Sequence, residues 1–204
     1  MHLLFPITYF GNFAWHQSFR RNADVLIYTG EPYQKQSYRN RCTILSANGP
    51  LDLSVPVIHS GSQPLHTSEV KISYSTNWTK DHLGAIRSAY GKSPFFEYYF
   101  ENIAKILNRR SEFLCELAGE TLEFACSKTG LEKTIRPSAE ALDGKINCSQ
   151  SAIEPKEREM FIGSSYPQVF ETKFPFQPNL CILDLLFNCG PESEMILENV
   201  KKEG

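Results

Sequence analysis

The sequence predicts an α/β fold, with α+β as the alternative, in which an N-terminal mixed sheet of short strands precedes a mainly helical C-terminal half. Two patterns support this: strand-like apolar runs before residue 75, and apolar positions spaced three or four residues apart after it. The chain has 204 residues, of which 41% are hydrophobic. A chain of this size buries roughly 70% of its unfolded surface, so we expect one domain over residues 1–204.

Short strand patterns occupy the first third of the chain. Residues 24–28 and 39–45 are runs rich in apolar side chains, and residues 51–57 alternate between apolar and polar side chains as a half-buried strand does. The alternation recurs at residues 70–74. Asn48-Gly49 lies between the second and third runs, and Asn-Gly in such a position favours the tight turn of an antiparallel hairpin.

Helical patterns begin at Trp78. Apolar residues recur every three or four positions from there, which predicts a helix that ends near Gly91. Ser93 and Pro94 together provide an N-cap and a first-turn proline for a second helix. A third helical pattern begins at Ser111.

The C-terminal part is more varied. Residues 127–159 lose all periodicity and gather polar residues, which predicts a long, partly mobile loop. Residues 161–176 have an aromatic-rich, extended pattern. Residues 180–187 predict a short amphipathic helix, and Pro191 can begin a last one.

Composition excludes several classes of function. The net charge is −2, from 21 basic and 23 acidic residues, so a nucleic-acid partner is not expected. The longest apolar stretch, residues 180–187, is too short to span a bilayer, and the first residues have no basic leader, so we expect a cytoplasmic protein. The six cysteines form no C-x-x-C pair, and the glycine-rich nucleotide-binding motifs are missing. No metal or cofactor is therefore predicted.

The most informative segment is the basic one between residues 33 and 41. If it is extended, Tyr33, Lys35, Arg39 and Arg41 project to one side, and if it is helical, Lys35 and Arg39 are still neighbours. Arginine and lysine suit carboxylate and phosphate ligands, and Asn40 adds a polar group between the two arginines. The alternative interpretation is a solvated face that pairs with acidic residues elsewhere.

Five other positions could contribute to a site. Trp78 and His82 share a helix face, where His82 could act as a general base or simply be packed beside the aromatic ring. Tyr98 belongs to an aromatic stripe that suits either a core or a ligand platform. Asn179 could cap a helix, and Asp184 could pair with a basic residue.

Several segments from residue 6 to about residue 191 together resemble the WbqC-like protein family. They are PITYF (6–10), YQKQSYRNRC (33–42), ANG (47–49), LSVPV (53–57), WTKDH (78–82), SAY (88–90), SPFFEYY (93–99), YPQVF (166–170), PNL (178–180) and DLLFNCGP (184–191). The resemblance implies a role in O-antigen and related polysaccharide gene clusters, as a glycine transferase that acts on an amino-sugar. It implies no catalytic set. Many members have a Gly-Tyr-Phe run where this chain has residues 12–15, so a substrate contacted there would differ.

Two hypotheses follow. The first is an aminoacyl or acyl transferase whose substrate is a small molecule, a nucleotide-linked amino-sugar. Lys35, Arg39 and Arg41 would hold a diphosphate or carboxylate. His82 would take the proton from the attacking amine, and Lys35 or Asn40 would stabilise the oxyanion. This requires His82 and Lys35 to share one site. The expected substrate-binding residues are Tyr9, Tyr33, Arg39, Asn40, Arg41, Trp78, Tyr98, Asn179 and Asp184. The second is a non-catalytic binding or assembly protein that recognises an anionic molecule or a protein partner; the oligomeric state is left open.

Overall fold

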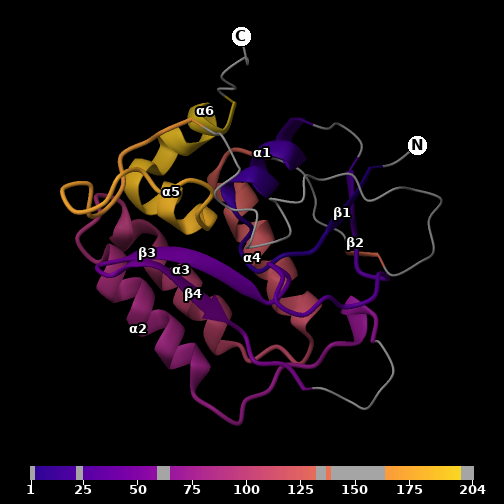
Figure 1. The fold of residues 1–204 in the computed structure, drawn as a ribbon. Coiled ribbons are helices and arrows are strands. Elements are labelled where there is room, and N and C mark those ends of the chain that lie inside the picture. Colours follow the sequence, from indigo (N-terminus) through magenta and orange to yellow (C-terminus); the bar gives the residue numbers. More distant parts are fainter. Residues whose placement is uncertain (1–2, 22–24, 59–64, 132–136, 139–163, 199–204) are drawn as a thin grey trace.

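The computed structural model describes residues 3–21, 25–58, 65–131, 137–138 and 164–198 (Figure 1). Short strands occupy mainly the N-terminal part and helices dominate from residue 78 onward, so the predicted fold class is confirmed. The strands form two separate sheets, one parallel and one antiparallel.

The parallel sheet contains β1 (Leu3–Pro6), β2 (Val25–Tyr28) and β5 (Pro137–Ser138), in the order β1-β2-β5. Parallel neighbours need a crossover connection, and α1 (Phe13–Arg21) provides it between β1 and β2. Sequence patterns did not predict α1, because its first five residues are all buried and it has no polar face there.

The antiparallel sheet is the predicted hairpin, but its turn lies one residue earlier than expected: Ala47 and Asn48 form the turn, and Gly49 already pairs with Ser46. Strands β3 (Arg41–Ser46) and β4 (Gly49–Ser54) pair from Arg41 with Ser54 to Ser46 with Gly49. The strand expected at residues 70–74 is not formed. Isolated bridges occur there instead, because Ile72 pairs with Val57 while Lys71 pairs with Phe113 on a different segment.

The helices follow the predicted periodicity, with small differences at their ends. They are η1 (Thr67–Glu69), α2 (Trp78–Tyr90), α3 (Phe96–Asn108), α4 (Leu114–Lys128), α5 (Ile182–Cys189), η4 (Gly190–Glu192) and α6 (Ser193–Glu198). Helix α3 begins at Phe96 because residues 93–95 form a turn, in which the Phe96 amide donates to the Ser93 carbonyl 3.2 Å away.

Two predictions for the chain after α4 have different outcomes. The predicted loop at residues 127–159 lies outside the described residues, apart from the end of α4, the three residues after it and β5. Residues 161–176 were expected to be extended. Their described part, residues 164–176, contains a turn in which the Phe174 amide donates to the Phe170 carbonyl 3.0 Å away.

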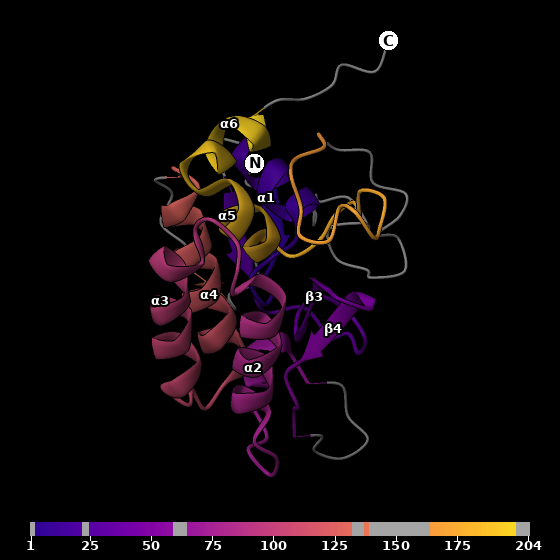
Figure 2. The same cartoon turned by 90° about the vertical axis from the view of Figure 1, so that its left-hand side faces the viewer.

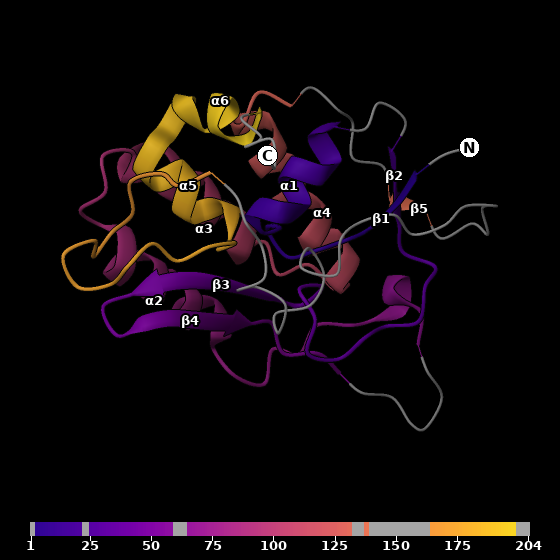
Figure 3. The same ribbon diagram turned by 45° about the horizontal axis from the view of Figure 1, so that its top comes forward.

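Helix α4 is shared by two hydrophobic clusters. The larger cluster lies between the hairpin and α2, α3, α4 and α5, and the smaller one lies between α4, α1 and the parallel sheet. Figure 2 shows the hairpin beside α2, with α3 and α4 on the far side of α2. Figure 3 shows the parallel strands at one end of the molecule, next to α1 and α4.

The turn from β1 into α1 depends on Gly11, and Gly11→Ala is expected to destabilise the protein by about 3 kcal/mol. Gly11 has φ +72°, and an added Cβ would lie 2.8 Å from Nε2 of His16 and 3.1 Å from Cδ2 of Leu122. Urea unfolding measures the loss. Gly84→Ala is the control, because a Cβ there in α2 meets nothing within 4 Å and should be neutral or stabilising. Equal stability of the two variants would contradict the assigned turn.

Candidate functional site

A pocket of about 410 Å³ brings together four of the predicted site residues, and we call it the basic pocket. It is lined by Tyr33, Lys35, Gln36, Asn40, Arg41, Ser54, Val55, Pro56 and Val57. The β2–β3 loop supplies the first four of these, and the open end of the hairpin supplies Arg41 and Ser54, which face each other across the strands. Residues 54–57 form one wall of this pocket. The sequence pattern predicts only a strand there and does not indicate a site.

Two cations define the charge of the basic pocket. Arg41 forms an ion pair with Asp52, with NH1 and Oδ2 3.0 Å apart, and its Nε donates to Oγ of Ser54 at 3.2 Å. Lys35 is exposed and forms no ion pair within the described part of the chain. Lys35 therefore provides the charge that is free for a ligand, while Asp52 and Ser54 hold Arg41 in place.

Tyr33 and Asn40 add hydrogen-bonding groups to this pocket. Burial raises the pKa of Tyr33 to about 12, against the opposing effect of Arg39 and Arg41, so the phenol keeps its proton at neutral pH. Nδ2 of Asn40 donates to the Val55 carbonyl at 2.9 Å. Oδ1 of Asn40 is buried and has no hydrogen-bond partner in the described structure, so it is an unused acceptor.

Arg39 does not line the basic pocket. Its guanidinium is buried, with Nε 3.0 Å from Oε1 of Glu31 and NH1 3.1 Å from Oε1 of Gln34. The prediction that Arg39 projects to the same side as Arg41 is wrong. Strand β3 begins only at Arg41, so strand alternation does not extend back to Arg39. Arg39 therefore has a structural role. Its pairing with an acidic residue agrees with the alternative interpretation of the basic segment, although the pair is buried and not solvated.

His82 lies in the core, one layer behind the basic pocket. It is 5% exposed, and its Nδ1 is 3.1 Å from the hydroxyl of Tyr9. Burial lowers the pKa of His82 to about 4, although a hydrogen bond with the Ser54 backbone opposes the shift. The imidazole is therefore neutral at pH 7, and the buried Tyr9, whose pKa is raised by burial, keeps its proton and donates to it.

The predicted proximity of Lys35 and His82 in one pocket is not found, because His82 does not line the basic pocket. Trp78 also belongs to the core. It lies edge-on to His82 with ring centroids 5.0 Å apart, and its Nε1 donates to the Ser73 carbonyl at 3.1 Å. Neither Tyr9 nor Trp78 offers a surface on which a substrate ring could stack.

The remaining predicted residues lie elsewhere. Tyr98 is 73% exposed on α3 and lines neither the basic pocket nor the aromatic one described below. Asn179 is a capping residue, as one interpretation suggested, but for α1: its Oδ1 accepts from the Ala14 amide at 2.9 Å. Asn12 directly precedes this helix and residues 13–15 begin it; all four are buried, so they are not an exposed substrate contact.

Asp184 is fully buried in α5, and the predicted partnership with a basic residue is wrong. Its Oδ1 accepts from the Tyr90 hydroxyl and its Oδ2 from Nε2 of Gln168, each at 2.9 Å. Burial raises the pKa of Asp184 to about 6, while hydrogen bonds from Tyr90, Tyr166 and Gln168 oppose the shift. Neutral donors therefore hold this carboxylate.

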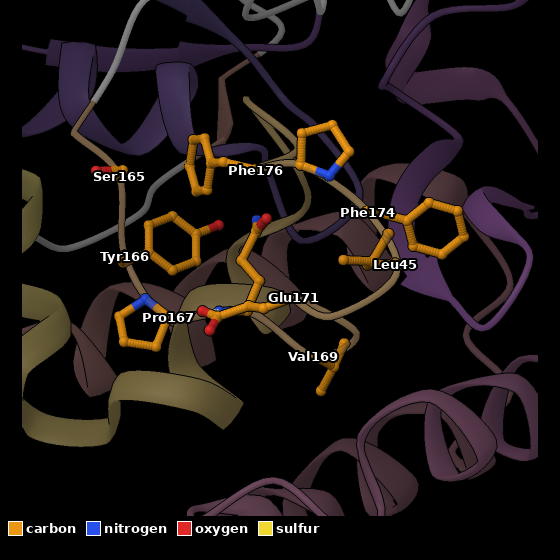
Figure 4. A pocket seen from close by; sticks show the side chains of 10 residues that line it. Leu45, Ser165, Tyr166, Pro167, Val169, Glu171, Phe174 and Phe176 are labelled. Carbon is orange, nitrogen blue, oxygen red and sulfur yellow. The ribbon is translucent and has the colours of Figure 1, made fainter.

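A second pocket, of about 490 Å³, opens beside Asp184, and we call it the aromatic pocket (Figure 4). Its lining consists of Leu45, Ser165, Tyr166, Pro167, Gln168, Val169, Glu171, Phe174, Pro175 and Phe176. No site prediction included these residues. The aromatic-rich pattern of residues 161–176 was the available signal, but it was interpreted only as extended chain.

The fold and these cavities define an α/β protein whose described part includes two ligand-sized pockets of different chemistry. The chain belongs to the WbqC-like protein family, whose model matches residues 8–154. It is also similar to the uncharacterized protein Rv1507c of Mycobacterium tuberculosis, with 27% identity over 198 residues, covering 83% of this chain and 85% of that protein. No solved structure matches the chain. None of the described helices is long and apolar enough to span a membrane.

Proposed function

We propose that this protein is an aminoacyl or acyl transferase, of the glycine-transferring type, that acts in the cytoplasm on a nucleotide-linked amino-sugar for surface polysaccharide synthesis. The observation that carries the proposal is the convergence of Tyr33, Lys35, Asn40 and Arg41 on one pocket. Its volume is in the usual range for small-molecule sites, and its two cations suit a diphosphate. The reaction type rests on the resemblance to the WbqC-like family.

In this proposal the residues have distinct roles. Arg41, oriented by Asp52 and Ser54, binds the diphosphate, and Tyr33 donates a hydrogen bond to it. Lys35 contributes its charge to diphosphate binding and, during acyl transfer, stabilises the negative charge that develops on the carbonyl oxygen. His82 does not take the proton of the attacking amine; that proton passes to solvent water as the amide bond forms and the bond between glycine and its activating group breaks. A buried imidazole with a pKa of about 4 and Nδ1 occupied by Tyr9 is a weak base, and its role is to support the pocket wall.

Binding of a uridine diphosphate amino-sugar tests the site. Isothermal titration calorimetry should show that Arg41→Ala and Lys35→Ala each weaken binding about 10-fold to 100-fold, since a hydrogen bond to a charged group contributes about 1.5–3 kcal/mol. Inorganic pyrophosphate should compete. The control is Lys80→Ala, which removes an exposed lysine of α2 outside the pocket and should bind as the native protein does. Unchanged affinity in both pocket variants would overturn the assignment.

A second candidate is a non-catalytic protein that binds the same anionic ligand. The burial of His82 favours it, because the described part of the basic pocket then contains no side chain suited to act as a general base at neutral pH. A turnover assay with activated glycine and the bound amino-sugar separates the two candidates. Product formation that Lys35→Ala abolishes supports the transferase, and tight binding without product supports the binding protein.

A further inference from the structure

The aromatic pocket differs in chemistry from the basic pocket. Tyr166 and Phe176 lie on one side of it in Figure 4, and Leu45 and Phe174 on the other. Val169 and two prolines complete a largely apolar wall. Pockets of this size with mostly apolar walls and few polar groups are typical of small-ligand sites.

Internal hydrogen bonds hold this pocket in shape without a ligand. Nε2 of Gln168 donates to the Gln177 carbonyl and to Oδ2 of Asp184, each at 2.9 Å, and Oε1 of Gln168 accepts from the Gln177 amide at 2.8 Å. The ring of Tyr166 is stacked on Phe13 and meets Phe176 edge-on, with centroids 5.9 and 5.3 Å apart. A site that is already ordered loses less entropy when a ligand binds.

The charges around the aromatic pocket disfavour an anion. The described residues of its lining include no lysine or arginine but do include Glu171, whose Oε1 accepts from the backbone amide of Gln168 at 2.7 Å. Asp184 adds a second carboxylate directly behind Gln168. The neighbouring cation, Lys173, is bound to the Ala47 carbonyl and lies 5.3 Å from the Phe174 ring centroid. The two carboxylates of Glu171 and Asp184 outnumber this one cation, so the charge near the pocket is negative on balance.

We propose that the aromatic pocket binds a small organic amine, a protonated primary amine on an apolar or ring-shaped body. The body packs between the aromatic side chains, and the ammonium group lies at the carboxylate of Glu171. Aromatic faces attract ammonium groups, and a carboxylate completes their recognition. Both features are present in this lining, and neither suits the anion that the basic pocket attracts. The proposal does not depend on the transfer reaction.

Three probes with the same ring and different charge test this inference: cyclohexylamine, cyclohexanol and cyclohexanecarboxylate. Calorimetric titration of the full chain should show that the amine binds at least about fivefold more tightly than the alcohol, and that the carboxylate binds most weakly of the three. Glucosamine compared with glucose repeats the test on a sugar ring. Equal affinity for amine and alcohol, or no binding of any amine, would overturn the proposal.

Two variants assign the binding to this pocket. Glu171→Gln keeps an oxygen that can accept from the backbone amide of Gln168, but it removes the negative charge. This variant should weaken amine binding about fivefold. Phe176→Ala removes a partly exposed ring and should weaken amine and alcohol alike. Arg41→Ala should leave amine binding unchanged, and Glu171→Gln should leave pyrophosphate binding unchanged. The assignments of the two pockets can therefore be disproved independently. If Glu171→Gln does not alter the affinity for the amine, the amine binds elsewhere.

Discussion

Asp184→Ala is expected to lower the free energy of unfolding by about 4 kcal/mol, because it leaves buried donors without an acceptor. The hydroxyl of Tyr90 and Nε2 of Gln168 each lose a hydrogen bond of 2.9 Å. Tyr166, which also bonds to this carboxylate, loses its bond as well. Each unsatisfied buried group costs about 1–3 kcal/mol, and the cavity left by the side chain adds to the loss.

Urea unfolding followed by circular dichroism measures this effect, with Asp184→Asn as the matched variant. Asparagine keeps one carbonyl acceptor in nearly the same volume, so the free energy of unfolding of the Asp184→Asn variant should fall by only about 1–2 kcal/mol. Tyr90→Phe should be destabilised similarly, because the Tyr90 hydroxyl also accepts from the Leu45 amide at 3.0 Å. A loss below about 1 kcal/mol in Asp184→Ala would show that these donors have other acceptors in solution.

Acidification is the second large expected effect, and two buried histidines cause it. Burial lowers the pKa of His16 and of His82 from 6.5 to about 4. The folded protein therefore binds these protons more weakly than the unfolded chain, and the stability they contribute above pH 6.5 is lost as the pH falls towards 4. One pKa unit corresponds to about 1.4 kcal/mol, so the lowered pKa values of the two imidazoles together correspond to about 7 kcal/mol of stability, of which about 5 kcal/mol is lost between pH 6.5 and pH 4.

Asp184 acts in the opposite direction. Its folded-state pKa is raised from 3.8 to about 6, so its contribution to stability is present at low pH and is lost as the pH rises through 6. Between pH 6.5 and pH 4, protonation of this carboxyl restores about 2 kcal/mol of stability, which leaves a net loss of about 3 kcal/mol in the native protein. Thermal or urea unfolding across this pH range measures the net slope.

A double variant isolates the histidine contribution. His82→Asn retains an acceptor for the Tyr9 hydroxyl, and His16→Gln retains a donor for the Phe10 carbonyl, which lies 2.8 Å from Nε2 of His16. Without the two imidazoles, Asp184 should dominate, and the double variant should become more stable on acidification from pH 6.5 to pH 4.5. Parallel pH profiles for the native protein and the double variant would contradict the assigned shifts.

The basic pocket could be predicted in part because its residues are close in the sequence. Tyr33, Lys35, Asn40 and Arg41 belong to one stretch of nine residues, so they gather in space under most backbone conformations. The exception is Arg39, whose direction depends on where β3 begins. The pocket wall at residues 54–57 could not be predicted, because it comes from the hairpin pairing.

The sequence by itself determined the local features: the two-residue hairpin turn before Gly49, the helical periods of α2, α3 and α4, and the gathering of cations at residues 33–41. Turn chemistry and amphipathic spacing act between near neighbours and need no knowledge of the rest of the chain.

Only the tertiary structure decided how exposed each chemical group is and which remote groups it meets. His82 bonds with Tyr9 across 73 positions, and Asp184 bonds with Tyr90 across 94. Leu45 joins residues 165–176 to form the aromatic pocket. Burial and these distant contacts change a pKa or close a pocket, and they arise only when the whole core is packed. For this reason the buried His82 could not be distinguished from an accessible base until the fold was known.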